Sequence, residues 1–218
     1  MPASNDQLRA HGTLDAFQLP RAPWGFFHLS NSLTYLTPLA GILSIWGFQH
    51  GHVWQAGAAL ALASLMDLLD GMFAQRFKRT IAQKRFGAQL DSLSDAFAFG
   101  ALPVTYFAMA AGSEIQYWQI LSAAFYLICA LTRLGYYNLQ HEERGGFVGV
   151  PTTIMGLLFS LLLAFQPTTT ATAAFLLAGG ILMVAPIRIP RPKPAVFFVV
   201  VSAAALLFSW HLYHGLVG

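Results

Sequence analysis

Long apolar stretches, separated by short polar connections, dominate this chain and limit what it can fold into. Of its 218 residues, 56% are hydrophobic and only 10% are charged. Such stretches are typical of helices that cross a lipid bilayer, since a spanning helix needs about 20 mostly apolar residues. The sequence therefore predicts an all-α, polytopic transmembrane bundle of six to seven spans. The stretches are residues 31–48, 53–74, 87–111, 117–138, 152–165, 170–185 and 195–212.

The first thirty residues have a different character. They begin as a polar segment and continue into the aromatic sequence PWGFF. Trp24, Phe26 and Phe27 are suited to the membrane interface, where amphipathic segments bury one face. We therefore divide the chain into a cytoplasmic or interfacial segment, 1–30, and a transmembrane domain, 31–218.

The basic residues follow an alternating pattern along the chain. All twelve Lys and Arg lie at the N-terminus, in 76–85, in 133–144 or in 188–193, and the connections between these regions have none. By the positive-inside rule, these four regions face the cytoplasm. Because topology explains the basic residues, we expect contact with membrane lipids and no nucleic-acid partner. The compact chain, with no evident targeting signal, favours a multi-pass protein of the bacterial or archaeal plasma membrane.

Four aspartates stand out against this apolar background. Asp67 and Asp70 share one helical face, and Asp91 and Asp95 share a face of the next predicted helix. A basic hinge, 76–86, would fold the two helices together and bring the four carboxylates into one cluster on the cytoplasmic side. Acids within a membrane are costly and mark functional sites.

Clustered carboxylates repel one another, and hard divalent cations are the usual remedy. The pattern therefore predicts a Mg²⁺ or Mn²⁺ site of one or two ions. Gly71, Ala74 and Gly87 lie on the same faces and leave room for a ligand such as a nucleotide diphosphate. The alternative is a plain hairpin with solvated acids at the ends of membrane helices.

This segment resembles the signature of the CDP-alcohol phosphotransferase family, D-x-x-D-G-x-x-A-R followed by G-x-x-x-D-x-x-x-D. The matching positions are Asp67, Asp70, Gly71, Ala74, Gly87, Asp91 and Asp95. Two departures are visible. Gln75 stands where the signature has arginine, with Arg76 one residue later, and the segment between Ala74 and Gly87 is longer than in the family pattern.

The resemblance implies a CDP-diacylglycerol substrate, release of CMP, and a homodimer. It implies metal binding by Asp67, Asp70, Asp91 and Asp95, with Asp95 also acting as general base. It further implies contacts to the CDP-lipid from a larger set: Asn31, Thr34, Gly71, Ala74, Arg76 and Gly87. Asn31 has a second interpretation, as the cap of the first span.

Two weaker matches concern the acceptor. RLGYYN followed by FVGVPTT, and later LMVAPIRIPRPK, resemble the phosphatidylserine synthase branch. They favour L-serine as acceptor, with Arg133 and Asn138 as acceptor-side or phosphate-side groups. Choline, inositol phosphate and glycerol phosphate remain open as acceptors. Outside this class, a transporter or proton relay, or a membrane scaffold without chemistry, also remains open.

Overall fold

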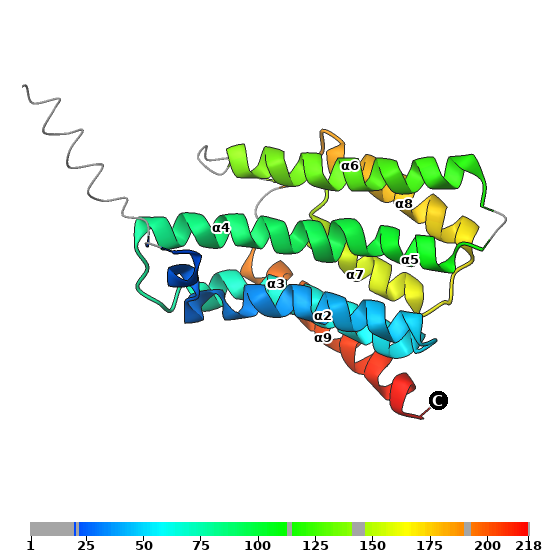
Figure 1. The fold of residues 1–218 in the computed structure, drawn as a ribbon, viewed down its shortest axis with the longest axis horizontal. Coiled ribbons are helices and arrows are strands. Elements are labelled where there is room, and N and C mark those ends of the chain that lie inside the picture. Colours follow the sequence, from blue (N-terminus) through cyan, green and yellow to red (C-terminus); the bar gives the residue numbers. More distant parts are fainter. Residues whose placement is uncertain (1–19, 21, 113–114, 141–146, 190–192, 218) are drawn as a thin grey trace, which may run out of the picture.

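The computed structural model describes residue 20 and residues 22–112, 115–140, 147–189 and 193–217. In these ranges the chain forms two short 3₁₀ turns, η1 and η2, and then long helices, most of which run roughly along one axis (Figure 1). The predicted all-α class is confirmed. In order, the elements are η1 Pro23–Phe26, η2 Leu29–Asn31, α2 Ser32–Gln49, α3 Val53–Ala74, α4 Ile81–Asp95, η3 Ala96–Ala101, α5 Leu102–Ala110, α6 Tyr117–Gln140, α7 Thr152–Leu163, α8 Thr169–Val184 and α9 Pro194–Val217, with two strands described below.

The long helices correspond to the seven predicted spans, because α4, η3 and α5 form one continuous rod over Ile81–Ala110. Within the described ranges, four segments are long and apolar enough to cross a membrane: Val53–Ala74, Ile81–Ala110, Tyr117–Leu139 and Pro194–Val217. The helices α7 and α8 are shorter and also apolar. The protein is therefore an integral membrane protein.

The connection between α3 and α4 is shorter than predicted. The predicted C-terminal boundary of the hinge, 76–86, is wrong, because α4 already begins at Ile81. Thr80 and Gln83 form a capping box: the Thr80 hydroxyl accepts from the Gln83 amide at 3.2 Å, and the Gln83 side chain accepts from the Thr80 amide at 2.9 Å. This reciprocal pair satisfies amides that are otherwise unpaired at a helix start and so fixes the beginning of α4.

The rod changes helical geometry immediately after Asp95. Residues Ala96–Ala101 form a π-helical turn, and Pro103 follows at the start of α5. A proline cannot donate to the carbonyl four residues earlier, which here belongs to Phe99. The Tyr126 hydroxyl of α6 donates to that carbonyl at 2.8 Å instead. The π turn and this tyrosine therefore let the rod continue past the proline.

A two-stranded ribbon, which the sequence did not predict, joins two connections at one end of the bundle. The strand β1, Phe147–Val148, pairs antiparallel with β2, Arg188–Ile189. Gly149 follows β1 with a φ angle of +74°, and its backbone amide donates a hydrogen bond to the Ile187 carbonyl at 2.9 Å. A side chain there would overlap the Met183 carbonyl, so glycine is required. The ribbon positions the entry into α7.

The last helix, α9, packs on α3 and crosses the bundle obliquely (Figure 1). His211 is fully buried against Gly57 of α3, where a Cβ atom would meet the imidazole ring. Its Nε2 lies 2.9 Å from the Ser160 carbonyl, and the Ser160 hydroxyl donates to the Gly57 carbonyl. The histidine therefore joins α9 to both α3 and α7.

Candidate active site

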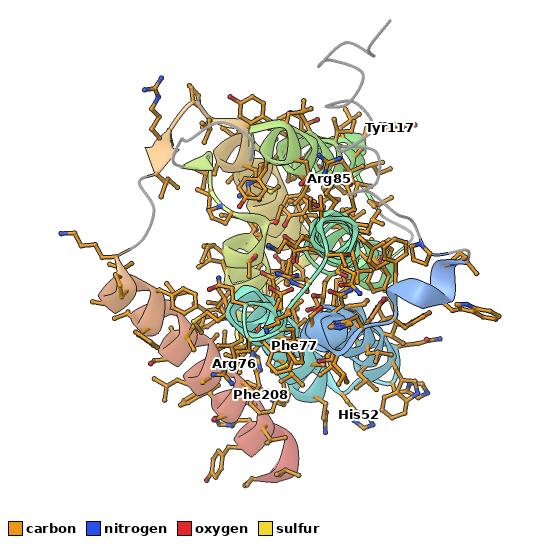
Figure 2. All side chains as sticks on the ribbon, turned by 90° about the vertical axis from the view of Figure 1, so that its left-hand side faces the viewer. His52, Arg76, Phe77, Arg85, Tyr117 and Phe208 are labelled. Carbon is orange, nitrogen blue, oxygen red and sulfur yellow. The ribbon has the colours of Figure 1, made fainter. Side chains whose placement is uncertain are left out.

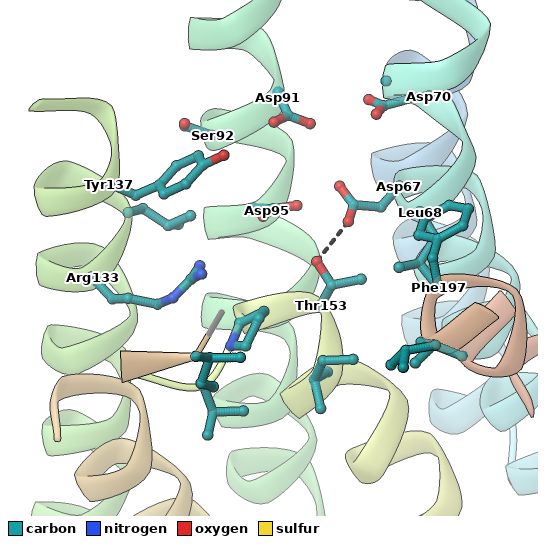
Figure 3. Close-up of a pocket in the computed structure, with 18 residues that line it drawn as sticks. Asp67, Leu68, Asp70, Asp91, Ser92, Asp95, Arg133, Tyr137, Thr153 and Phe197 are labelled. Atoms are coloured by element: carbon teal, nitrogen blue, oxygen red, sulfur yellow. Dashed lines mark hydrogen bonds between the residues drawn. The ribbon is translucent and has the colours of Figure 1, made fainter. Parts of the chain in front are cut away.

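The four predicted aspartates come together between α3 and α4. They are the only acidic side chains in the described ranges. Carboxylate oxygens of Asp67, Asp70 and Asp91 lie within 4.8 Å of one another. Asp95 lines the same cavity as these three residues. Figure 3 shows the two pairs facing each other across the gap between the helices.

Threonine hydroxyls orient three of these carboxylates. Thr34 of α2 donates a hydrogen bond to Asp70 at 2.7 Å. Two neighbouring residues of α7 donate to the other two carboxylates. Thr153 donates to Asp67 at 2.6 Å, and Thr152 donates to Asp95 at 3.0 Å. Sequence reasoning selected Thr34 as a lipid contact but missed the pair on α7. The motif P-T-T at the start of α7 was the available signal, yet nothing local connects it to residues more than fifty positions earlier.

We expect Thr153→Val to weaken the apparent affinity of the carboxylate cluster for Mn²⁺ about tenfold, since hydrogen bonds to metal-ligating groups are typically worth 10–100-fold. Valine keeps the shape of the side chain but cannot donate to Asp67. The measurement is Mn²⁺ binding to the purified protein. Thr153→Ser retains the hydroxyl and should restore most of the affinity, whereas equal losses in the two variants would contradict the role.

A cavity of about 540 Å³ opens beside the carboxylates. The acids and Gly71 form one wall, residues of α6 and α7 form a second, and Val196, Phe197 and Val200 of α9 close it with apolar surface. Apart from its own stretch of helix, no described atom lies within 4 Å of where a Cβ of Gly71 would stand, so that position is open. The cavity thus combines a charged base with hydrocarbon-like walls, as an amphiphilic substrate would need.

The predicted acceptor-side residues occupy different positions. Arg133 lines the cavity and is 7% exposed, and its Nη1 donates to the Thr152 hydroxyl at 3.3 Å. Its Nε is buried without a hydrogen-bond partner in the described structure. Asn138 is not among the residues lining the cavity; its side-chain oxygen accepts from the Ser92 hydroxyl at 2.9 Å. Its predicted role therefore has less structural support.

Of the six residues predicted to contact the CDP-lipid, Gly71 lines the cavity and the others do not. Asn31 precedes α2, but its side chain makes no cap hydrogen bond, so the capping interpretation is wrong. Its amide instead donates to the Phe26 carbonyl at 3.4 Å, and its oxygen accepts from the Ser30 hydroxyl. Gly87 lies directly beneath that oxygen. Ala74 is buried. Arg76, which is labelled in Figure 2, is exposed.

The donor set fits a divalent cation. Hard cations such as Mg²⁺ and Mn²⁺ prefer carboxylate oxygens, and three are already close enough to share one ion. Asp95 adds a buried Oδ1 that has no hydrogen-bond partner in the described structure. Threonine hydroxyls and Arg133 supply part of the positive potential that four acids need, and a bound cation would supply the rest.

Comparison with known families agrees with this geometry. A family model described as CDP-alcohol phosphatidyltransferase matches residues 27–211. The chain therefore belongs to the CDP-alcohol phosphatidyltransferase family and is a transferase. The match includes all four aspartates, the threonines of α2 and α7, and the lining of the cavity.

Individual relatives narrow the comparison. The chain is 31% identical over 167 residues to the archaetidylserine synthase of Methanothermobacter thermautotrophicus, covering 76% of this chain and 71% of that protein. It is 27% identical over 155 residues to the CDP-diacylglycerol–serine O-phosphatidyltransferase of Bacillus subtilis, covering 71% and 85%. With the enzyme of the same name from Methanocaldococcus jannaschii it shares 25% over 181 residues, covering 83% and 82%.

Proposed function

We propose that this enzyme transfers the phosphatidyl group of CDP-diacylglycerol to L-serine and releases CMP. The observation that carries the acceptor is Arg133, a buried guanidinium beside the carboxylates with an unpartnered Nε. A serine carboxylate would satisfy such a group, because arginine and carboxylate form strong charge-assisted hydrogen bonds. Choline offers no anion. Glycerol phosphate and inositol phosphate do, and against them the names of the relatives favour serine.

In this proposal, Asp95 is the general base. It lies in the wall of the cavity between the metal-binding carboxylates and Arg133 (Figure 3). Its Oδ2 accepts from Thr152, and Oδ1 remains for the acceptor hydroxyl. As Asp95 takes that proton, the serine oxygen forms a bond to the phosphorus that carries diacylglycerol, and the bond from this phosphorus to the CMP oxygen breaks. No covalent enzyme intermediate is required.

Asp67, Asp70 and Asp91 would hold Mg²⁺ or Mn²⁺, with Asp95 able to contribute an oxygen. Such a cation, when bound, neutralises the diphosphate and the charge that develops as CMP leaves. On the family resemblance, we propose that Asn31, Thr34, Gly71, Ala74 and Gly87 lie beside the bound CDP part. Thr34 has the additional role of holding Asp70.

We place the site on the cytoplasmic side of the plasma membrane. The supporting observation is that the end of the bundle that holds the carboxylates also holds the basic connection 75–80 and the basic residues Arg188 and Lys193, as positive-inside topology requires. We also propose a homodimer, on the family resemblance alone. A transporter or proton relay has less support, because the described acids form one cluster rather than a path across the bundle.

The acceptor is tested by supplying the purified protein, in vesicles with CDP-diacylglycerol and Mn²⁺, with one alcohol at a time. We expect CMP release with L-serine at least tenfold faster than with choline, glycerol phosphate or inositol phosphate. Arg133→Met should raise the KM for serine much more than the KM for CDP-diacylglycerol. Faster turnover with another alcohol would replace serine as the acceptor and leave the transferase assignment intact.

A further inference from the structure

The connection between α3 and α4 contains two arginines in very different surroundings. Arg76 is exposed, just after the end of α3. Arg79 is half-buried, and its Nε is fully buried with no hydrogen-bond partner in the described part of the chain. A buried cationic donor without an acceptor is costly, so its position needs an explanation.

The Arg79 side chain reaches back over α4. A Cβ placed on Gly87 would lie 3.3 Å from Arg79 Nη1 and 3.2 Å from Asn31 Oδ1. The guanidinium and the asparagine side chain therefore meet above this glycine, and any larger residue would displace them. Gly87 lies one helical turn before Asp91 on the same face, and Arg79 is close enough to Asp70 to act on its charge. This corner is thus continuous with the metal-binding carboxylates.

The local structure fixes the backbone around Arg79. It directly precedes Thr80, whose capping box fixes the chain at the start of α4. Nearby, Phe26 and Phe86 stack with ring centroids 4.3 Å apart, and His28 packs edge-on against Phe77 at 5.8 Å. A guanidinium carried by a fixed stretch of backbone loses less freedom on binding than one on a mobile loop, which favours recognition of an anion.

We propose that Arg79 is the residue of this chain that binds the diphosphate of the nucleotide, in the role that the signature assigns to the position now occupied by Gln75. The inference rests on the proposed function. The connection is longer than in the family pattern, and this length lets a residue late in it return to Gly87. Arg79 Nε would donate to a phosphate oxygen, beside the carboxylates that hold the cation. Arg76, the neighbour of Gln75 in sequence, is exposed.

The test measures the Kd of CDP-diacylglycerol in detergent micelles, together with KM values for both substrates. Arg79→Ala and Arg79→Gln should each weaken CDP-diacylglycerol binding about tenfold or more, because a hydrogen bond to a charged group is lost. The KM for serine should change less than twofold. Arg79→Lys should fall between, since it keeps the charge but not the planar fork. Lys78→Ala, which removes an exposed charge from the same connection, is the matched control.

Two results would overturn the inference: wild-type affinity in both Arg79→Ala and Arg79→Gln, or a larger loss in Arg76→Ala than in either. Equal rises in the KM for both substrates would also overturn it, since that indicates a general structural role. Failure of the wild-type protein to bind CDP-diacylglycerol would instead reject the proposed function itself. Thermal unfolding of each variant identifies any that does not fold. If Arg79→Ala does not fold, Arg79→Gln still tests the inference, because glutamine preserves much of the side-chain volume.

Discussion

Replacing Asp95 with asparagine should lower the rate of CMP release on the order of a thousandfold, within the range that general bases contribute. Asparagine matches the size of aspartate and can still accept the hydrogen bond from Thr152, so packing at this buried position is preserved. It cannot take a proton from the acceptor hydroxyl. The expected defect is therefore in the chemical step.

The measurement is single-turnover CMP release in vesicles with saturating CDP-diacylglycerol and serine. The Kd for CDP-diacylglycerol should stay within a few-fold of wild type, because the three carboxylates proposed to hold the cation for the diphosphate remain in the variant. Gln89→Ala on the exposed face of the same helix is the control. Near-normal release in Asp95→Asn would remove this residue as the base, and another group would have to accept the proton.

The helical repeat was sufficient to predict the carboxylate cluster. Asp67 and Asp70 are three residues apart and Asp91 and Asp95 four apart, so each pair must share a face of its helix. The short connection between the two helices then leaves few ways to arrange the pairs. The boundaries of the apolar stretches were also informative, because a membrane helix must satisfy its backbone internally and so continues until polar residues begin.

Contacts between distant segments could not be predicted in this way. Thr152 and Thr153 reach the aspartates only because α7 enters the bundle beside α3 and α4, and the ribbon that fixes this entry depends on the positive φ of Gly149. The position of Arg79 is a related case. Sequence proximity to the substituted signature position favoured Arg76, whereas in the structure Arg76 is exposed and the Arg79 side chain reaches Gly87 from just before the capping box of α4.

The second large effect should come from Asp91, whose carboxylate lies within 4.8 Å of those of Asp67 and Asp70. We expect Asp91→Asn to lower CMP release on the order of a thousandfold, the upper range for loss of one electrostatic contact in an active site. It should also weaken Mn²⁺ binding, measured by electron paramagnetic resonance on protein stripped with a chelator. Adding Mg²⁺ or Mn²⁺ back to the stripped wild-type enzyme should restore its activity and show which ion it prefers.

The same substitution should change stability in the opposite direction. Without metal, four carboxylates repel one another in a medium of low dielectric constant, so removing one charge should raise the unfolding temperature of the metal-free protein. With metal, the wild type should gain stability by ligand binding while Asp91→Asn gains much less. A metal-independent unfolding temperature in the wild type, or unchanged Mn²⁺ binding in the variant, would contradict a cation site at these aspartates. A metal site therefore predicts that Asp91→Asn is more stable than the wild type without metal and less stable than the wild type with metal. An ordinary cluster of buried acids predicts no such reversal.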